Sequence, residues 1–281
     1  MKFVFFGTPY PARDTLEILK SHGLTPQVIV TNPDSRQGRG QILTPTLTNV
    51  WGSDNNIPVL TPEKLDASSI TEITAYNTPL GICVAYGKII PQSLIDAFSK
   101  GILNIHYSLL PKYRGASPVE SALLNGDTVT GVTIQKMVHA LDEGDIVAAQ
   151  SVEILPNETT KELRGRLVEI GAELLASVLE EYCDGTVILK PQDASIATHV
   201  GKIKKEAGLL DLNAQGFENW NKYRAYAEWP GTYFFATRNG KSIRVKVAAA
   251  ELDGEGQFTI LRVVPEGKKE MDFEAFQNSI S

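Results

Sequence analysis

The sequence predicts an α/β protein, with an open, mostly parallel sheet that carries helices on both faces and a small β-rich unit after it. Three observations predict this class. The apolar run Lys2–Phe6, the helix-like stretch Pro11–Lys20 and the apolar run Val28–Val30 follow one another in the order of a βαβ unit. The run Ile82–Ala85 has no polar alternation, as expected of a strand covered on both faces. After about Ile196 the pattern changes to short β-like runs.

The composition narrows the class of protein. With 281 residues, of which 42% are hydrophobic and 21% are charged, the chain resembles an ordinary globular protein with a large core. No apolar run approaches the roughly 20 residues of a membrane span, and the first run is shorter than a signal-peptide core of about 7–15 residues. Two cysteines exclude a disulfide framework, and the net charge of −6 argues against a broadly basic surface. We therefore expect a cytoplasmic protein with no membrane partner.

The elements of the larger domain follow in order. Gly7-Thr8-Pro9-Tyr10-Pro11 occupies the place of a dinucleotide-binding turn but lacks the G-x-G-x-x-G pattern, so we exclude NAD there. Capping-box patterns begin two further helices. The remaining expected elements are a strand at Ile57–Leu60, a helix at Pro62–Asp66, a helix at Pro91–Phe98, a strand ending near Asn104, a helix from Ser117 to Leu124, a strand at Thr133–Met137 and a helix from Thr159 to about Tyr182.

The change in composition places a domain boundary between residues 195 and 196. Residues 196–281 contain a helix-like stretch at Gly216–Ala225 and three β-like runs, with Asn239-Gly240 as a hairpin turn. The segment is short for a closed five-stranded barrel, so we expect a reduced, barrel-like domain. The β-like runs are Tyr233–Ala236, Ile243–Val247 and Phe258–Val264.

Asn104 and His106 stand after the apolar run Gly101–Leu103. Because they are two residues apart on a strand, both side chains point to the same face. An amide and an imidazole together suit the binding of a polarised carbonyl oxygen, although a polar pair that only caps a strand end is the alternative. A carboxylate from the acidic loop Val138–Asp145 would orient His106 and favour the imidazolium, unless each of these acids is an exposed turn residue.

Basic residues occur in two other places. Arg36 and Arg39 lie in the turn-rich loop 31–41. They are suited to contacting a phosphate backbone, and a mobile, solvated loop is the alternative. A second, smaller basic cluster contains Lys204 and Lys205.

Several motifs resemble those of the 10-formyltetrahydrofolate-dependent formyltransferases. The stretch from Asn104-Ile105-His106 to Pro111, together with Leu141-Asp142-Glu143-Gly144, is similar to the family signature. Within the family, the chain most resembles the members that formylate methionyl-tRNA, and the matches span nearly the whole chain. The other matching motifs are Phe6-Gly7-Thr8-Pro9, Asn32-Pro33-Asp34, Gly38-Arg39-Gly40, Ala85-Tyr86-Gly87, Tyr113-Arg114-Gly115-Ala116, Gly131-Val132-Thr133, Trp229-Pro230 and Gly267-Lys268-Lys269.

The resemblance implies a Rossmann-like catalytic domain, an OB-type C-terminal domain and formyl transfer from 10-formyltetrahydrofolate to the α-amine of methionyl initiator tRNA, for translation initiation. Protonated His106 and the Asn104 amide would stabilise the oxyanion, and Asp142 would hold His106 charged and relay the proton of the amine. We expect a monomer that needs no metal. The resemblance assigns folate binding to Tyr86, Gly87, Ser108, Leu109, Leu110, Pro111, Val138 and His139, and tRNA contacts to Arg36, Arg39, Lys204 and Lys205.

Two departures from the family pattern bear on the acceptor. Gln41-Ile42 stands where the family usually has lysines, and the C-terminal domain is shortened between Val247 and Phe258. Both changes predict weaker or differently placed tRNA binding. An N-formyltransferase acting on an amino sugar nucleotide is the alternative function, and Arg39→Ala distinguishes the two because only the tRNA acceptor needs Arg39. A non-catalytic RNA-binding protein is a third possibility, for which His106→Ala would leave function intact.

Overall fold

The structure, a computed structural model, describes residues 1–38 and 40–280, and these form two compact units. The first unit contains residues 1–115, 131–152 and 164–199, and the second contains 116–130, 153–163 and 200–281. Two short stretches from earlier in the sequence are therefore grouped with the C-terminal residues. A linear boundary between residues 195 and 196 stays a prediction.

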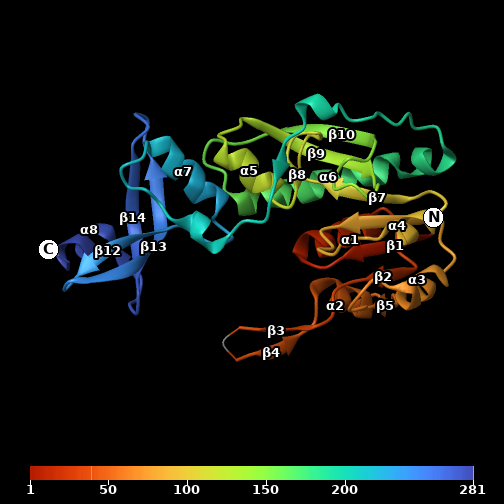
Figure 1. Cartoon of the computed structure of the whole chain (residues 1–281), viewed down its shortest axis with the longest axis horizontal. Coiled ribbons are helices and arrows are strands. Elements are labelled where there is room, and N and C mark those ends of the chain that lie inside the picture. The colour runs from red at the N-terminus through yellow and green to blue at the C-terminus, as the bar shows by residue number, and fades with distance from the viewer. Residues whose placement is uncertain (39, 281) are drawn as a thin grey trace. The chain divides into compact units, whose positions relative to one another are not determined.

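A seven-stranded sheet runs through the first unit, in the order β10-β9-β7-β6-β1-β2-β5 (Figure 1). The strands from β5 to β7 in this order are parallel, and β9 pairs antiparallel with β7. The expected α/β class with a mostly parallel sheet is thus confirmed. The strands are β1 (Phe3–Gly7), β2 (Val28–Val30), β5 (Val59–Leu60), β6 (Leu80–Val84), β7 (Ile102–His106), β9 (Val129–Lys136) and β10 (Ile146–Glu153).

Helices cover both faces of this sheet. Ile73 of α3 and Leu94 of α4 join a buried cluster with alternate residues of the central strands. On the other face, Gly171 of α6 lies against Ile105 of β7. A Cβ added to Gly171 would lie 2.8 Å from the Cγ2 atom of Ile105. Full burial of such apolar side chains contributes about 1.5–3 kcal/mol each, which explains the continuous apolar runs in the strands. The helices are α1 (Tyr10–Ser21), α2 (Leu47–Asp54), α3 (Ala67–Thr74), α4 (Gln92–Asp96) and α6 (Thr160–Asp184).

Two stretches of the first unit differ from expectation. The predicted loop 31–41 contains the strand β3 (Ser35–Gln37). This strand forms a small antiparallel hairpin with β4 (Ile42–Thr44), which follows the loop. The helix predicted at Pro62–Asp66 is wrong, because these residues precede the helix, which begins at Ala67 and ends at Thr74. Asp66 is its N-cap, accepting from the backbone N–H of Ser68 and Ser69, so the acidic residue ends the loop and does not belong to a helix.

The second unit contains a four-stranded antiparallel sheet in the order β12-β13-β14-β15. The Asn239-Gly240 turn has φ of 50° and 73°, the left-handed pair that a two-residue hairpin needs. Phe234, Val245, Val263 and Phe276 are among the side chains of its core. The elements are α5 (Pro118–Leu124), α7 (Gly216–Ala225), β12 (Tyr233–Arg238), β13 (Lys241–Leu252), β14 (Phe258–Pro265), β15 (Met271–Asp272) and α8 (Phe273–Asn278).

Pairing between strands places the polar residues of β7 on one face of the first sheet. Asn104 lies opposite Cys83 of β6 on one side and Gln135 of β9 on the other, and His106 lies opposite Thr133. Side chains of directly paired residues point to the same face. The amide, the imidazole and the two polar residues of β9 therefore occupy one patch at the C-terminal end of β7.

Candidate active site

His106 is the last residue of β7 and its side chain is buried. Its Nε2 lies 2.9 Å from the backbone carbonyl oxygen of Tyr113, and its Nδ1 lies 3.6 Å from Oδ2 of Asp142. A carbonyl oxygen can only accept, so Nε2 carries a proton and donates it to Tyr113. This contact fixes the ring and leaves Nδ1 as the nitrogen that exchanges a proton or faces a ligand.

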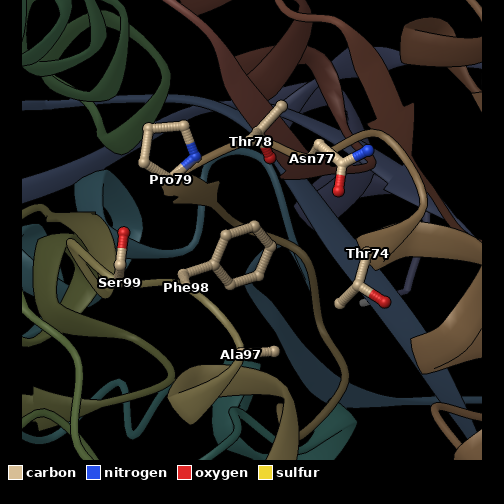
Figure 2. A pocket seen from close by; sticks show the side chains of 7 residues that line it. All are labelled: Thr74, Asn77, Thr78, Pro79, Ala97, Phe98 and Ser99. Carbon is tan, nitrogen blue, oxygen red and sulfur yellow. The ribbon is translucent and has the colours of Figure 1, made fainter.

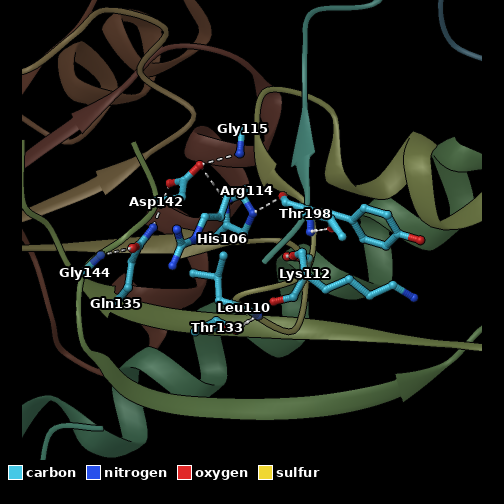
Figure 3. Close-up of polar contacts among 12 residues, drawn as sticks. His106, Leu110, Lys112, Arg114, Gly115, Thr133, Gln135, Asp142, Gly144 and Thr198 are labelled. Atoms are coloured by element: carbon cyan, nitrogen blue, oxygen red, sulfur yellow. Dashed lines mark hydrogen bonds and ion pairs between the residues drawn. The ribbon is translucent and has the colours of Figure 1, made fainter. Parts of the chain in front are cut away.

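Asp142 approaches His106 from a loop, and its backbone has a φ of 55°. Its Oδ2 accepts from the backbone N–H of Gly115 at 2.8 Å, and its Oδ1 accepts from Nε2 of Gln135 at 2.7 Å (Figure 3). Both oxygens act as acceptors, which is the hydrogen-bonding pattern of a carboxylate. The left-handed backbone is uncommon for a residue other than glycine and is held here by these contacts.

A second set of hydrogen bonds holds the backbone beside Asp142. Nε2 of Gln192 donates to the carbonyl oxygens of Asp142 and Gly144, at 2.9 and 2.7 Å. Buried Arg114 donates from Nε to Oε1 of Gln192 at 3.0 Å and pairs through Nη1 with Glu143 at 3.1 Å. Gly144 is required, because a Cβ there would come within 1.8 Å of the carbonyl oxygen of Lys136.

Asn104 is the polar group of this patch that the protein leaves available. Its residue is half-buried, and its side-chain amide makes no hydrogen bond to the described part of the chain. Asn104, His106 and Asp142 are thus brought together as the sequence motif suggested. Their catalytic roles stay predictions.

The residues predicted to bind folate fall into two groups. Ser108 and Leu110 are buried, and the Ser108 hydroxyl donates to the carbonyl oxygen of Lys112 at 2.5 Å, so these residues shape the loop. Val138 and His139 are exposed. Leu109 and Pro111 are half-buried, and the Leu110–Pro111 peptide bond is cis.

The Tyr86–Gly87 segment follows β6. The Tyr86 ring is in the core, with its edge against Phe6 and the ring centroids 5.8 Å apart, and burial raises the pKa of its hydroxyl to about 12. Its backbone carbonyl accepts from the Thr8 hydroxyl at 3.3 Å and from Asn32 Nδ2 at 3.1 Å. Tyr86 is therefore a core residue whose carbonyl oxygen is already engaged by Thr8 and Asn32, whereas Gly87 is exposed with a φ of 83°.

The residues predicted to contact tRNA belong to different units. Arg36 is exposed on β3 and donates to the carbonyl oxygen of Gln41 at 3.0 Å. Lys204 and Lys205 are exposed in the second unit, next to a short 3-10 helix at Lys205–Gly208. Arg39 lies outside the described residues.

Gln135, Gln192 and Arg114 were not recognised as site residues from the sequence. Gln135 had a usable signal, because it stands two residues after Thr133 on the predicted strand and therefore shares the face of Thr133. Gln192 gave none. It follows α6 by eight residues and reaches the site only through the folded chain.

A separate cavity of about 530 Å³ opens at the other end of the strands (Figure 2). Pro79 precedes β6 and Ser99 precedes β7, so the cavity lies at their N-terminal ends, whereas His106 ends β7. No titratable side chain lines it. It is not a candidate for the chemistry. The lining residues are Thr74, Asn77, Thr78, Pro79, Ala97, Phe98 and Ser99.

Comparison with known proteins identifies the family. Residues 1–179 match the formyl transferase family, and residues 202–257 match the formyl transferase C-terminal domain. The chain belongs to the formyl transferase family. The first match contains Asn104, His106 and Asp142, so the patch described above lies in the family's defining domain.

Curated relatives narrow the resemblance. A methionyl-tRNA formyltransferase of Geobacter sulfurreducens is 38% identical over 95% of this chain and 84% of its own length. One from Chloroflexus aggregans is 39% identical over 89% of this chain and 80% of its own length. The predicted resemblance to methionyl-tRNA formyltransferases is confirmed.

Solved structures of the same fold include a sugar formyl transferase and HypX. WlaRD, a sugar 3N-formyl transferase solved in the presence of dTDP and 5-N-formyl-THF, has a TM-score of 0.65 at 18% identity, covering 96% of this chain and 99% of that one. HypX from Aquifex aeolicus, solved in complex with tetrahydrofolic acid, has a TM-score of 0.65 at 16% identity, covering 100% of this chain and 47% of that one. At these identities the likeness shows the fold alone.

Two further properties concern the described residues. Across residues 1–38 and 40–280, no helix combines the length and apolar character needed to cross a bilayer. Within the same residues, no group of three or more His, Cys, Asp or Glu side chains is placed to hold a metal ion.

Proposed function

We propose that the chain transfers the formyl group of 10-formyltetrahydrofolate to the α-amine of methionyl initiator tRNA. One observation carries the proposal: an oriented His106–Asp142 pair lies on the same patch as the unpartnered Asn104 amide, in a chain related along 95% of its length to a methionyl-tRNA formyltransferase. We also propose that the protein acts in the cytoplasm and that it is a monomer. Light scattering of the pure protein tests the monomeric state.

The site residues fit a formylated folate. The half-buried Asn104 amide is a free donor, as a carbonyl oxygen requires. Two apolar side chains of the acidic loop, Val138 and Leu141, are 44% and 69% exposed and would regain burial against a flat ring. Bound folate would supply the formyl carbon to the amine.

Each catalytic residue has a separate task. Asn104 donates to the formyl oxygen, which gains negative charge as the amine attacks. As the bond from the amine to the formyl carbon forms and the bond from that carbon to N10 of the folate breaks, His106, whose Nε2–H is taken by Tyr113, accepts the proton of the amine at Nδ1 and passes it to N10 as the folate leaves. Asp142 stabilises the imidazolium from 3.6 Å. Preorganised donors of this kind lower the activation free energy, because they need no rearrangement as charge develops on the formyl oxygen.

The tRNA acceptor also has support on the surface of the second unit. Between Tyr233 and Ala250 the chain has four basic residues and no acidic one. Among the described carboxylates, none forms an ion pair with Arg238, Lys241, Arg244 or Lys246. The guanidinium of Arg244 stacks 3.7 Å above the Tyr233 ring, with Phe235 exposed beside it. Unpaired cations next to aromatic rings suit a nucleic-acid backbone and its bases.

The test is a competition for acceptors. The protein, at equal concentrations of charged initiator tRNA and of dTDP-linked amino sugars, is supplied with 10-formyltetrahydrofolate, and the formylated product is identified by mass spectrometry. We expect formylmethionyl-tRNA. Formylation of an amino sugar alone would replace the proposed acceptor, and no product with any acceptor would contradict the proposed reaction.

A further inference from the structure

Gln135 makes two hydrogen bonds inside the candidate site. It extends from β9 directly opposite Asn104 and is 1% exposed. Its Nε2 donates to Oδ1 of Asp142 at 2.7 Å, and its Oε1 accepts from the backbone N–H of Gly144 at 3.2 Å (Figure 3). The side chain thus spans the Asp142 loop from the sheet side, whereas Gln192 holds the same backbone through its carbonyl oxygens.

The two ends of this side chain have different consequences. Acceptance from Gly144 shapes the loop, and any isosteric acceptor would do this. Donation to Asp142 acts on the carboxylate itself, because it occupies Oδ1 and leaves Oδ2 as the oxygen that faces His106 Nδ1. Gly115 occupies the other side of Oδ2. With both oxygens engaged, the carboxylate cannot rotate away from His106 without breaking a buried hydrogen bond.

We propose that Gln135 is a positioning residue, which holds the Asp142 carboxylate toward His106 Nδ1 so that the imidazole, and not Asp142, carries the proton during formyl transfer. This inference rests on the proposed function. Gln135 has no role of its own in the bond that forms. It acts through Asp142, and its effect belongs to kcat and to the pH dependence of kcat.

The substitution Gln135→Glu separates positioning from simple packing. Glutamate has nearly the same length and volume and keeps the acceptor for Gly144, but when it is ionised its own negative charge lies next to Oδ1 of Asp142. Two carboxylates that close cannot both stay ionised at low cost. When protonated, the glutamate can donate to Asp142 and restore the original hydrogen bond. Gln135 contacts Asp142, which in turn interacts with His106 and Cys83, and the Arg114–Glu143 ion pair lies next to Asp142 in the chain. All of these groups remain in the variant.

The ionisation of the introduced glutamate next to Asp142 predicts how kcat changes between pH 5.5 and pH 8.5. The ratio of wild-type to Gln135→Glu kcat should rise with pH, by about tenfold or more across this range, while KM for both substrates stays within about twofold. Gln135→Leu, which can make neither hydrogen bond, should lower kcat at every pH with no such trend. Gln150→Glu makes the same change at an exposed position of β10, and its ratio to wild type should be flat.

The outcomes separate this inference from the proposed function. Wild-type protein that does not formylate methionyl-tRNA contradicts the proposed function. Active wild type with a Gln135→Glu ratio that is flat with pH, while circular dichroism shows the variant folded, contradicts the positioning role. If Gln135→Glu does not fold, a Gln135→Leu kcat within about twofold of wild type contradicts it equally.

Discussion

Asn104 is the residue whose removal tests the oxyanion site most simply. Asn104→Leu keeps the volume and removes the only amide donor of the patch that has no partner among the described residues. We expect kcat to fall by about 10²–10³ and KM for tRNA to change by less than about twofold, because the interaction strengthens as charge develops. Steady-state formylation measures both.

A matched control uses the same change elsewhere. Asn213→Leu replaces an exposed asparagine of the second unit and should leave kcat at the wild-type value. A raised KM with unchanged kcat for Asn104→Leu would mean that the amide binds the substrate and the transition state equally, which contradicts a role in oxyanion stabilisation.

At the same scale, sequence reasoning found the residues that carry chemistry and missed those that place them. Asn104, His106 and Asp142 belong to a recognisable motif, and period-2 alternation put the first two on one face. Gln192 and Arg114 act through long-range hydrogen bonds, and no local pattern indicates which oxygen a side chain will reach. The 3.6 Å distance from His106 to Asp142 likewise follows from a loop with a left-handed residue, which the sequence Leu141-Asp142 does not indicate.

Among the elements, the long helix α6 has an N-terminus that depends on pH. Thr159 donates to Oε2 of Glu162 from its backbone N–H at 2.8 Å and from its hydroxyl at 2.7 Å, and these bonds hold the pKa of Glu162 below its usual value. A lowered folded pKa means that the contribution to stability is present above the unfolded value of about 4.3 and disappears as pH falls through the folded value. Glu162→Ala should therefore lower Tm at pH 7 and less so near pH 3.5.

The size of this effect is modest because Glu162 is exposed. We expect about 0.5–1 kcal/mol at pH 7, the low end of measured caps. Glu169→Ala makes the same substitution at an exposed position in the same helix and serves as the reference for helix propensity. A difference in Tm between the two variants that stays constant from pH 7 to pH 3.5 would show that the cap is not electrostatic.

The elements themselves were largely predictable, with instructive exceptions. At the capping box expected at Ser117–Glu120, the Ser117 side chain makes no cap hydrogen bond, and its hydroxyl donates to the carbonyl oxygen of Gly201 at 2.6 Å. In α6, Gly171 and Ala172 are buried, because small residues allow the helix to approach Ile105 and Val132. Close packing between a helix and a sheet is a tertiary property that side-chain size alone does not reveal.

At the scale of the whole molecule, acceptor binding should depend on salt through the β12–β13 hairpin. Removing one phosphate-binding cation should lower the slope of log K against log salt by about 0.7–0.9. The variant with Lys241→Gln and Lys246→Gln should therefore bind methionyl-tRNA more weakly, with a slope shallower by about 1.5. Filter binding at low and at physiological KCl concentrations measures this slope, and kcat at saturating tRNA should not change.

Net charge provides the control for this prediction. Lys64→Gln with Lys161→Gln removes the same number of charges at exposed positions outside β12 and β13, and its slope should equal that of the wild type. Equal slopes for both double variants would exclude the hairpin as a phosphate-binding surface. Arg262 is unsuitable for comparison because it already pairs with Glu270 and Asp272.

The division into two units was only partly predictable from the sequence. The shift in composition near Ile196 located the small β-rich region, and its four-stranded sheet confirms that expectation. Residues 116–130 and 153–163 are grouped with it in space, because α5 packs against α7 and the Thr160 hydroxyl donates to the carbonyl oxygen of Ala225 at 2.6 Å. A shift in composition along the sequence cannot reveal a unit built from separate segments.

Formyl transfer in a single turnover, with enzyme in excess over methionyl-tRNA, tests most directly whether His106 performs the chemistry. The account predicts that His106→Ala lowers this rate constant by at least about 10² while the tRNA dissociation constant stays within about twofold. A His106→Ala rate constant equal to that of the wild type would contradict it.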